Sequence, residues 1–257
     1  MLNLAAANGV DVLDTAIAYG ESEACLGEVG TTGFKIVTKL PAIPDCCDDV
    51  DAWVQHQLSF SLTRLNVASV YGLLLHRAEQ LLGIHGQALN SSLQRLKKAG
   101  RVEKIGVSIY SPFELDALVS RYHFDLVQAP MNLVDRRLVT SGWLQRLKSE
   151  GVEVHTRSAF LQGLLLMRRS EIPNKFEPWS YLWNRWHGWL ESAQFSAVQA
   201  CLAYPLSFSG VDRVIVGVDT VSQLEQILSA EACIPGHLPD LGCDSEDLIN
   251  PSRWTLL

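Results

Sequence analysis

Short apolar runs alternate along the chain with longer segments in which apolar residues recur every three or four positions. The apolar runs, which we interpret as buried strands, are residues 10–16, 34–40, 69–76, 102–110, 124–132, 152–160 and 211–218. Helical spacing is found over residues 21–30, 48–66, 87–100, 141–150 and 220–229, and in a helix opened by Ser111 and Pro112. Runs that are apolar at every position are typical of parallel strands buried on both faces. The pattern therefore predicts seven βα units.

Repeated βα units leave two architectures open, a doubly wound open sheet and a closed eight-stranded barrel. No GxGxxG sequence follows any of the strands, which weakens the dinucleotide-binding form of the open sheet. Strand 152–160 precedes a longer stretch that we expect to be irregular. With no shift in composition along its 257 residues, the chain is expected to form a single domain, 1–257, of which 231–257 is a C-terminal tail.

Composition excludes several classes of function. The formal net charge is −7 and no run of basic residues occurs, which argues against a nucleic-acid partner. No apolar stretch reaches the roughly 18 residues that span a bilayer, and the N-terminus has no secretory signal pattern. The six cysteines form no CxxC and no zinc-ligand spacing, so no metal site is expected. We expect a cytoplasmic monomer that acts on a small molecule.

Polar side chains stand at the ends of five successive predicted strands. They are Asp14, Lys39, His76, Ser108 and Gln128. Each has an ordinary structural interpretation when taken alone, such as a capping carboxylate, a surface lysine or a hydrogen-bonded core histidine. In a closed barrel, however, the carboxyl ends of the strands gather at one face, where active sites are built. The repetition therefore favours a functional site at that face.

Tyr19, five residues after Asp14, adds a possible proton donor to this group. A phenol has a pKa near 10 and is a poor acid at neutral pH unless a nearby ammonium such as Lys39 stabilises the phenolate. A carboxylate such as Asp14 holds that ammonium, and an imidazole such as His76 can donate to a carbonyl oxygen. Together they predict a proton donor aimed at a carbonyl group. The electrons must come from a hydride-donating cofactor.

Several stretches in which these residues lie resemble the aldo-keto reductase family. They are VDVLDTAIAYGESEACLG, KIVTKL, SLTRLNVASVYGLLLH, LKKAGRVEKIGVSIY, FDLVQAPMNLVD, SAFLQGLLL and VIVGVDTVSQLEQIL, in the family's order. The resemblance implies a TIM (β/α)8-type barrel that reduces aldehydes or ketones with a nicotinamide, usually NADPH. It also implies that Tyr19 is the general acid, that Lys39 lowers its pKa, and that Asp14 holds Lys39. His76 would orient the carbonyl group.

The resemblance also implies a set of cofactor contacts. Ser108 and Gln128 match carboxamide-binding and ring-supporting positions, and the remaining matches are Arg157, Ser158 and Phe160 near the nicotinamide and pyrophosphate, and Gly217, Asp219 and Gln223 in the adenosine-binding segment. Four positions depart from the family pattern, namely Ile109, Met131, Gln226 and Ile227. The carboxylate of Asp219 would repel a 2′-phosphate. The family resemblance implies NADPH as the cofactor, whereas the charge of Asp219 favours NADH.

The N-terminal residues MLNLAAANG resemble the end of the family's first barrel helix. The resemblance thus implies that the first β-strand and its Gly-containing loop are missing from this chain. Two explanations are open, a true start upstream of Met1 or a degenerate family member, and we favour a misplaced start or a truncated gene. The second explanation corresponds to an alternative function, a catalytically weakened relic that acts as a nucleotide-binding or regulatory protein. A third class, a metal hydrolase on a similar barrel, would need several His and Asp ligands at strand ends. Only Asp14 and His76 qualify, so this class is not favoured.

Two aromatic segments admit both a structural and a functional interpretation. Trp179, Trp183 and Trp186 share one helical face, which predicts packing against the body of the domain, with a flap over the substrate as the alternative. The tail 231–257 resembles tails of bacterial aldo-keto reductases associated with surface-sugar biosynthesis. That resemblance implies a sugar-derived carbonyl substrate, while Trp254 itself is expected to belong to a structural strap.

Overall fold

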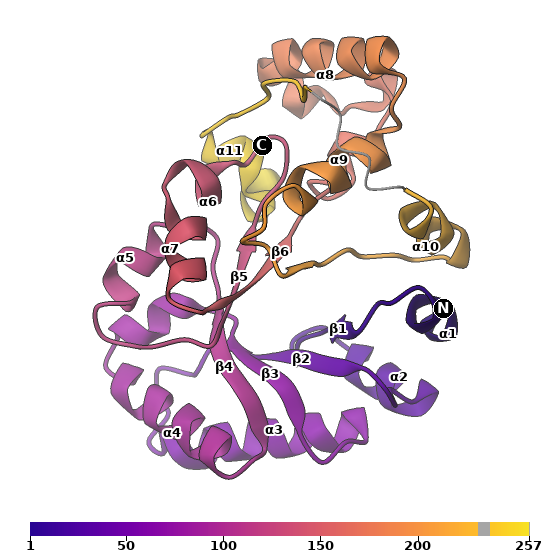
Figure 1. Ribbon diagram of the computed structural model, residues 1–257. Helices are drawn as coiled ribbons and strands as arrows, with labels where there is room; N and C mark the ends of the chain where they lie inside the picture. The colour runs from indigo at the N-terminus through magenta and orange to yellow at the C-terminus, as the bar shows by residue number, and fades with distance from the viewer. Residues whose placement is uncertain (231–236, 257) are drawn as a thin grey trace. The chain divides into compact units, whose positions relative to one another are not determined.

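The computed structural model describes residues 1–230 and 237–256 (Figure 1). The predicted single domain divides into two compact units. The first unit comprises Met1–Gln128 and Gly151–Glu153, and the second comprises Ala129–Glu150 and Val154–Leu257. Residues 231–236 and 257 of the predicted tail lie outside the described residues. Among the residues that are described, no helix combines the length and the apolar character needed to cross a membrane.

The first unit contains parallel strands that follow one another in the sheet in sequence order. The strands are β1 (Val12–Asp14), β2 (Lys35–Leu40), β3 (Val70–Leu75), β4 (Val102–Ser108) and the first half of β5 (Leu126–Pro130). The helices are α1 (Leu2–Ala7), α2 (Ser22–Val29), α3 (Val50–Leu65), η1 (Ala78–Leu82), α4 (Gly86–Lys98) and α5 (Glu114–Leu118). Each predicted strand of this unit is therefore present, although shorter at its ends than its apolar run.

One buried apolar cluster of the first unit lies on the face of the sheet that carries Lys39, because Val37 of this cluster is two residues before Lys39 on β2. Val37, Leu74 and Leu126 are buried in one cluster and come from three strands. Gly106 lets two strands approach closely, because a Cβ atom there would lie 1.7 Å from the carbonyl oxygen of Leu126. Helix α3 buries one apolar face and packs beside α4 (Figure 1). The sheet is thus a rigid support for the residues at its strand ends.

Helix α3 has clear capping signals at both ends. The Asp49 carboxylate accepts a hydrogen bond from the Ala52 amide, so the cap is Asp49 and not Asp48, where the sequence pattern begins. At the other end Asn66 adopts the left-handed conformation with φ of 55°, which asparagine tolerates better than most residues. These caps fix where the chain turns back toward β3.

The second unit contains the end of β5 and two further parallel strands. Its elements are α6 (Arg137–Thr140), α7 (Trp143–Ser149), β6 (Glu153–Arg157), η2 (Leu164–Leu166), η3 (Arg169–Glu171), η4 (Asn174–Trp179), α8 (Ser180–Ala193), α9 (Ala197–Leu206), β7 (Arg213–Val214), α10 (Val221–Leu228), α11 (Glu246–Ile249) and η5 (Pro251–Leu256). Strands β6 and β7 are paired, with His155 opposite Arg213. The expectation of an irregular stretch after strand 152–160 is wrong in part, because this stretch contains α8 and α9.

The aromatic face of α8 packs inward. Trp183 and Trp186 are each 1 % exposed, and their indole N–H groups donate to the carbonyl oxygens of Phe176 and Leu165. This burial confirms the packing interpretation for these two residues. In the tail, the Trp254 indole donates to the Leu248 carbonyl and its ring meets Phe176 edge-on. Trp254 therefore has the structural role expected of a strap.

Candidate active site

The pairing of β1 with β2 brings Asp14 and Lys39 together. Asp14 is the last residue of β1 and lies opposite Val37, two residues before Lys39 on the neighbouring strand. Beyond the paired strand the alignment continues, because the Ile17 amide donates to the Lys39 carbonyl. In parallel strands side chains two residues apart share a face. Asp14 and Lys39 therefore point to the same side near the carboxyl ends of the strands.

Lys39 is a buried ammonium with two defined partners. Its side chain is 1 % exposed, and Nζ lies 2.6 Å from Oδ2 of Asp14 and 2.9 Å from the carbonyl oxygen of Thr15. A lysine removed from water in this way is costly unless its charge is paired and its protons are bonded. The Asp14 carboxylate, 10 % exposed, supplies that pairing. The site thus retains a fixed positive charge beneath its surface.

Tyr19 lies above this charge in the turn that follows β1. Its backbone amide donates to the Ala16 carbonyl, and Gly20 with φ of 54° continues the turn. The Lys39 ammonium lies 5.2 Å from the centroid of the Tyr19 ring. In contrast to Lys39, Tyr19 is 48 % exposed. A ring in this position can meet a ligand on one side and the lysine on the other.

His76 completes the predicted group. It follows β3 directly, and its backbone amide donates to the Leu40 carbonyl at the end of β2. The imidazole meets the Tyr19 ring edge-on, with 5.7 Å between the ring centroids and 80° between the planes. The structure therefore brings all four residues of the predicted tetrad together in the first unit. Their catalytic roles remain predictions.

Ser108, the last residue of β4, is the neighbour of Gln128, which lies in the middle of β5 and not at its end as predicted. They are paired in register, and their side chains are 4 % and 1 % exposed. Gln128 also contacts the tetrad, since its Nε2 donates to Oδ1 of Asp14 over 2.7 Å. Ile109, which stands where the family usually has asparagine, is fully buried and offers no polar side chain. The hydroxyl and the amide are therefore the side-chain groups that β4 and β5 offer to a carboxamide.

The next three predicted cofactor residues belong to the second unit. Arg157 ends β6, and its guanidinium lies 3.3 Å from the Ser158 hydroxyl. Ser158 has a positive φ of 63°, and its carbonyl oxygen accepts a hydrogen bond from Nδ2 of the Asn132 side chain. Phe160 is half-buried two residues further on. The left-handed residue turns the chain sharply at the end of β6, where a pyrophosphate-binding loop is predicted.

The predicted adenosine-binding residues stand at the start of α10. Gly217, Asp219 and Gln223 are all exposed. Gln223 has a clear structural task, because its side-chain oxygen accepts hydrogen bonds from the amides of Asp219 and Thr220 while the Thr220 hydroxyl accepts one from the Gln223 amide. This reciprocal pattern is a capping box. A cofactor role for these residues remains a prediction.

Glu23 in α2 is a buried carboxylate close to β2 that sequence reasoning missed. It is 1 % exposed and accepts hydrogen bonds from Thr38, at 2.7 Å, and from Ser61, at 2.6 Å. The Arg64 guanidinium binds its second oxygen. Glu23 thereby ties α2 and α3 to the residue that precedes Lys39. The stretch GESE gave a signal only in its polarity, which does not distinguish a buried acid from a surface acid.

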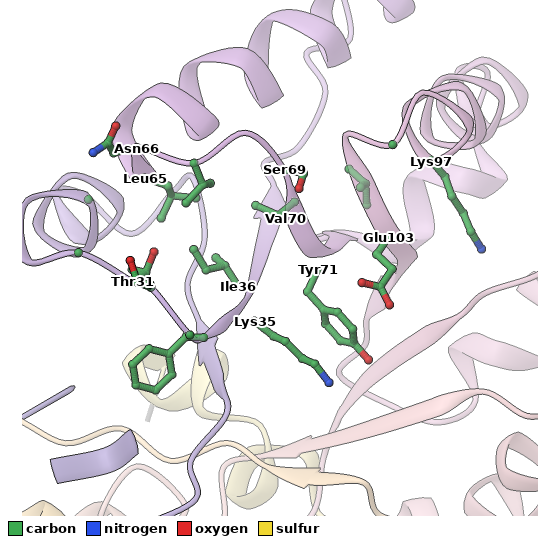
Figure 2. A pocket seen from close by; sticks show the side chains of 18 residues that line it. Thr31, Lys35, Ile36, Leu65, Asn66, Ser69, Val70, Tyr71, Lys97 and Glu103 are labelled. Atoms are coloured by element: carbon green, nitrogen blue, oxygen red, sulfur yellow. The ribbon is translucent and has the colours of Figure 1, made fainter. Parts of the chain in front are cut away.

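A separate cavity of about 790 Å³ opens at the other ends of the strands (Figure 2). It is lined by residues that include Lys35, Tyr71 and Glu103, near the amino ends of β2, β3 and β4, and by no residue of the tetrad. The Lys35 ammonium lies 4.8 Å from the Tyr71 ring centroid. We take the tetrad as the candidate active site, because its residues form a chemically complementary group.

Tyr71 beside this cavity belongs to a polar cluster with perturbed titration. Its hydroxyl donates to Glu153 over 2.5 Å, and Lys104 binds the same carboxylate. Burial and the Glu153 carboxylate raise the pKa of Tyr71. Burial alone would lower the pKa of Lys104, but hydrogen bonds to Glu153 and Tyr71 outweigh it and raise that pKa. This cluster stabilises the amino ends of the strands.

Comparison with known proteins identifies the family and the fold. The chain is 27 % identical over 274 residues to L-galactose dehydrogenase from Arabidopsis thaliana, covering 93 % of this chain and 78 % of the plant enzyme.

Solved structures of an aldo-keto reductase from Bacillus halodurans match with TM-scores of 0.73 (holo form) and 0.72 (apo form). They share 19 % and 20 % identity, over 89 % of this chain and 79 % and 78 % of theirs. This likeness confirms the predicted (β/α)8-type barrel fold, of which seven strands occur in the described residues. The model of the Aldo/keto reductase family matches residues 1–234. The chain therefore belongs to the aldo/keto reductase family.

Proposed function

We propose that the protein reduces an aldehyde or ketone to an alcohol with NAD(P)H, and that Tyr19 is the general acid. Family membership supports an oxidoreductase, and one observation carries the more specific proposal. A buried ammonium, Lys39, is held 2.6 Å from the Asp14 carboxylate and 5.2 Å from the ring centroid of an exposed tyrosine. This arrangement places a stabilising charge beside a phenol that a substrate can reach.

Each side chain of the tetrad has a definite task in this reaction. The carbonyl oxygen of the substrate accepts hydrogen bonds from the Tyr19 hydroxyl and from His76, which polarise the C=O bond. As negative charge develops on that oxygen, Tyr19 transfers its proton to it. The Lys39 ammonium stabilises the phenolate that remains, and Asp14 keeps the ammonium in place. Tyr19 then recovers its proton from solvent, to which its ring is exposed.

The residues beside the tetrad fit a nicotinamide. Ser108 and Gln128 place a buried hydroxyl and a buried amide side by side, and these groups match the donor and acceptor of a carboxamide. These two residues would hold the carboxamide of a reduced nicotinamide, which would supply the hydride for the carbonyl carbon. We assign the remaining cofactor contacts to Arg157, Ser158, Phe160, Gly217, Asp219 and Gln223. The Asp219 carboxylate favours NADH over NADPH by charge, against the family's usual choice.

We propose a carbohydrate-derived carbonyl compound as the substrate class. The plant relative is named for a dehydrogenase of L-galactose, a sugar. The resemblance of the tail to those of reductases from surface-sugar biosynthesis supports the same class. The alternative of a catalytically weakened relic is not favoured by the comparisons, and the assembled tetrad gives no support to it.

Two experiments test the proposal in order. Fluorescence quenching with NADPH and NADH measures cofactor binding, and the absence of saturable binding by either would contradict the reductase function. Turnover is then followed by nicotinamide absorbance with a generic aldehyde and a set of aldoses. Tyr19→Phe should lower kcat by about 10²–10⁴-fold and leave cofactor affinity nearly unchanged. Tyr181→Phe, at a tyrosine that is 57 % exposed in α8, is the matched control and should retain full activity.

A further inference from the structure

The two oxygens of the Asp14 carboxylate have different partners on different strands. Oδ2 accepts from the Lys39 ammonium on β2 at 2.6 Å, and Oδ1 accepts from Nε2 of Gln128 on β5 at 2.7 Å. An ionised carboxylate only accepts hydrogen bonds, so the Gln128 amide must turn its NH₂ group toward it. The orientation of this amide is therefore fixed by the charge on Asp14.

Burial makes this contact consequential. Gln128 and Lys39 are each 1 % exposed and the Asp14 side chain is 10 % exposed, so water offers little replacement for a lost partner. A carboxylate held at one oxygen alone can rotate about its side-chain torsions, whereas one held at both oxygens keeps a single orientation. The Gln128 contact thus determines which way Oδ2 faces.

We propose that Gln128 is a positioning residue for the tetrad. It holds the Asp14 carboxylate so that Oδ2 faces Lys39, and it withdraws part of the carboxylate's charge into its own N–H bond. The first effect keeps the Lys39 ammonium in place beside Tyr19, and the second leaves more of the Lys39 charge available to the Tyr19 phenolate. This role lies outside the carboxamide contact predicted for Gln128, and its catalytic consequence rests on the proposed function.

Removal of the amide has an expected direction. In Gln128→Met a thioether of similar length replaces the amide and cannot donate a hydrogen bond. Asp14 then places its whole charge against Lys39 and no longer keeps the ammonium in one position, so that the phenolate of Tyr19 loses stabilisation. Tyr19 should therefore ionise at a higher pH in the variant than in the wild type.

An alkaline titration measures this shift without turnover. The ultraviolet absorbance of phenolate is recorded for the wild type and for Gln128→Met, and the spectrum of the matching Tyr19→Phe variant is subtracted from each. The difference isolates Tyr19 from the other five tyrosines. The expected result is a higher midpoint in Gln128→Met. An unchanged midpoint in a folded variant would overturn the proposal.

A control variant separates positioning from general loss of stability. Gln80 is also partly buried, and its side chain exchanges hydrogen bonds with the backbone of Ile43 at 3.0 and 3.1 Å. Gln80→Met should lower stability by a similar amount, measured by urea unfolding, and leave the Tyr19 midpoint in place. Equal shifts in Gln80→Met and Gln128→Met would reject the positioning role.

Kinetics provide an independent second measurement. If Tyr19 must be protonated to act, kcat falls at high pH. In Gln128→Met this fall in kcat should occur at a higher pH than in the wild type, together with the shift of the spectroscopic midpoint. At neutral pH kcat should fall about 10-fold with the KM for the carbonyl substrate nearly unchanged. A wild-type chain without turnover would reject the proposed function, but the titration would still decide whether Gln128 positions Asp14.

Discussion

The pairing of Lys39 with Asp14 makes a quantitative prediction about stability. Lys39→Met leaves a carboxylate that is 10 % exposed beside an apolar side chain. Loss of one partner from a buried ion pair costs about 3–5 kcal/mol of unfolding free energy. Asp14 keeps its hydrogen bond from Gln128, so we expect the lower end, about 3 kcal/mol. For a chain of this size that loss lowers Tm by roughly 6–12 °C.

A double-mutant cycle isolates the pair from other effects. Asp14→Asn removes the charge left behind by Lys39→Met, so the double variant should be more stable than the sum of the two single losses predicts. We expect a coupling free energy of about 2 kcal/mol, within the range for contacting residues. Losses that add to within about 0.5 kcal/mol would refute the reasoning, because additivity is the mark of independent sites.

The assay must report on the unit that contains the tetrad. Six of the seven tryptophans belong to the second unit and only Trp53 belongs to the first. Urea unfolding should therefore be followed by far-ultraviolet circular dichroism as well as by fluorescence. Lys98→Met, which removes an exposed lysine of α4, is the control and should change stability by less than about 0.5 kcal/mol.

Three further predictions concern the pH dependence of stability, close packing and thiol reactivity. The pKa of Lys104 is raised in the folded protein, so its contribution to stability is full below the ordinary value of 10.5 and is lost as pH rises beyond it. The urea midpoint of the wild type should therefore fall above that pH, and the midpoint of Lys104→Met should fall less steeply. Gly106→Ala should lower the free energy of unfolding by more than about 3 kcal/mol, because its Cβ atom would collide with the backbone of a neighbouring strand. Gly188→Ala in α8, where the Cβ atom would meet open space, should raise the free energy of unfolding by about 0.5–1 kcal/mol, as measured by thermal unfolding. Burial raises the pKa of the Cys201 thiol, so a thiol reagent followed by mass spectrometry should label the exposed Cys46 in native protein and Cys201 only after denaturation.

The tetrad could be predicted from the sequence because its members follow apolar runs directly. Asp14, Lys39 and His76 each stand at or next to the end of a strand, and the parallel order of the strands brings those ends together. Tyr19 lies only five residues from Asp14, so its proximity is a local property of one turn. The chemical complementarity of the four residues then distinguished them from ordinary strand-end residues.

Contacts between distant residues could not be predicted in the same way. Gln128 and Asp14 are 114 residues apart, and their contact depends on how the side chains pack after the sheet has formed. Glu23 is similar, because its three partners are 15 to 41 residues away and belong to β2 and α3. Helix α9 is a different case, since Ser196 and Gln199 form a capping box that the sequence displays. Its nearly uniform apolar composition, with Pro205 near its end, obscured the helical period.

Strand β1 has only three residues, and the general acid, its carboxylate and the turn between them all depend on it. In the described part of the chain β1 is paired with β2 alone. An element with so few backbone hydrogen bonds can open locally at a small fraction of the global unfolding free energy. Brief separation of β1 from β2 would release Asp14 from Lys39 and carry Tyr19 away while the other strands stay folded. Amide hydrogen exchange at Thr15 and Ile17 would then report the lifetime of the assembled site more directly than any melting temperature does.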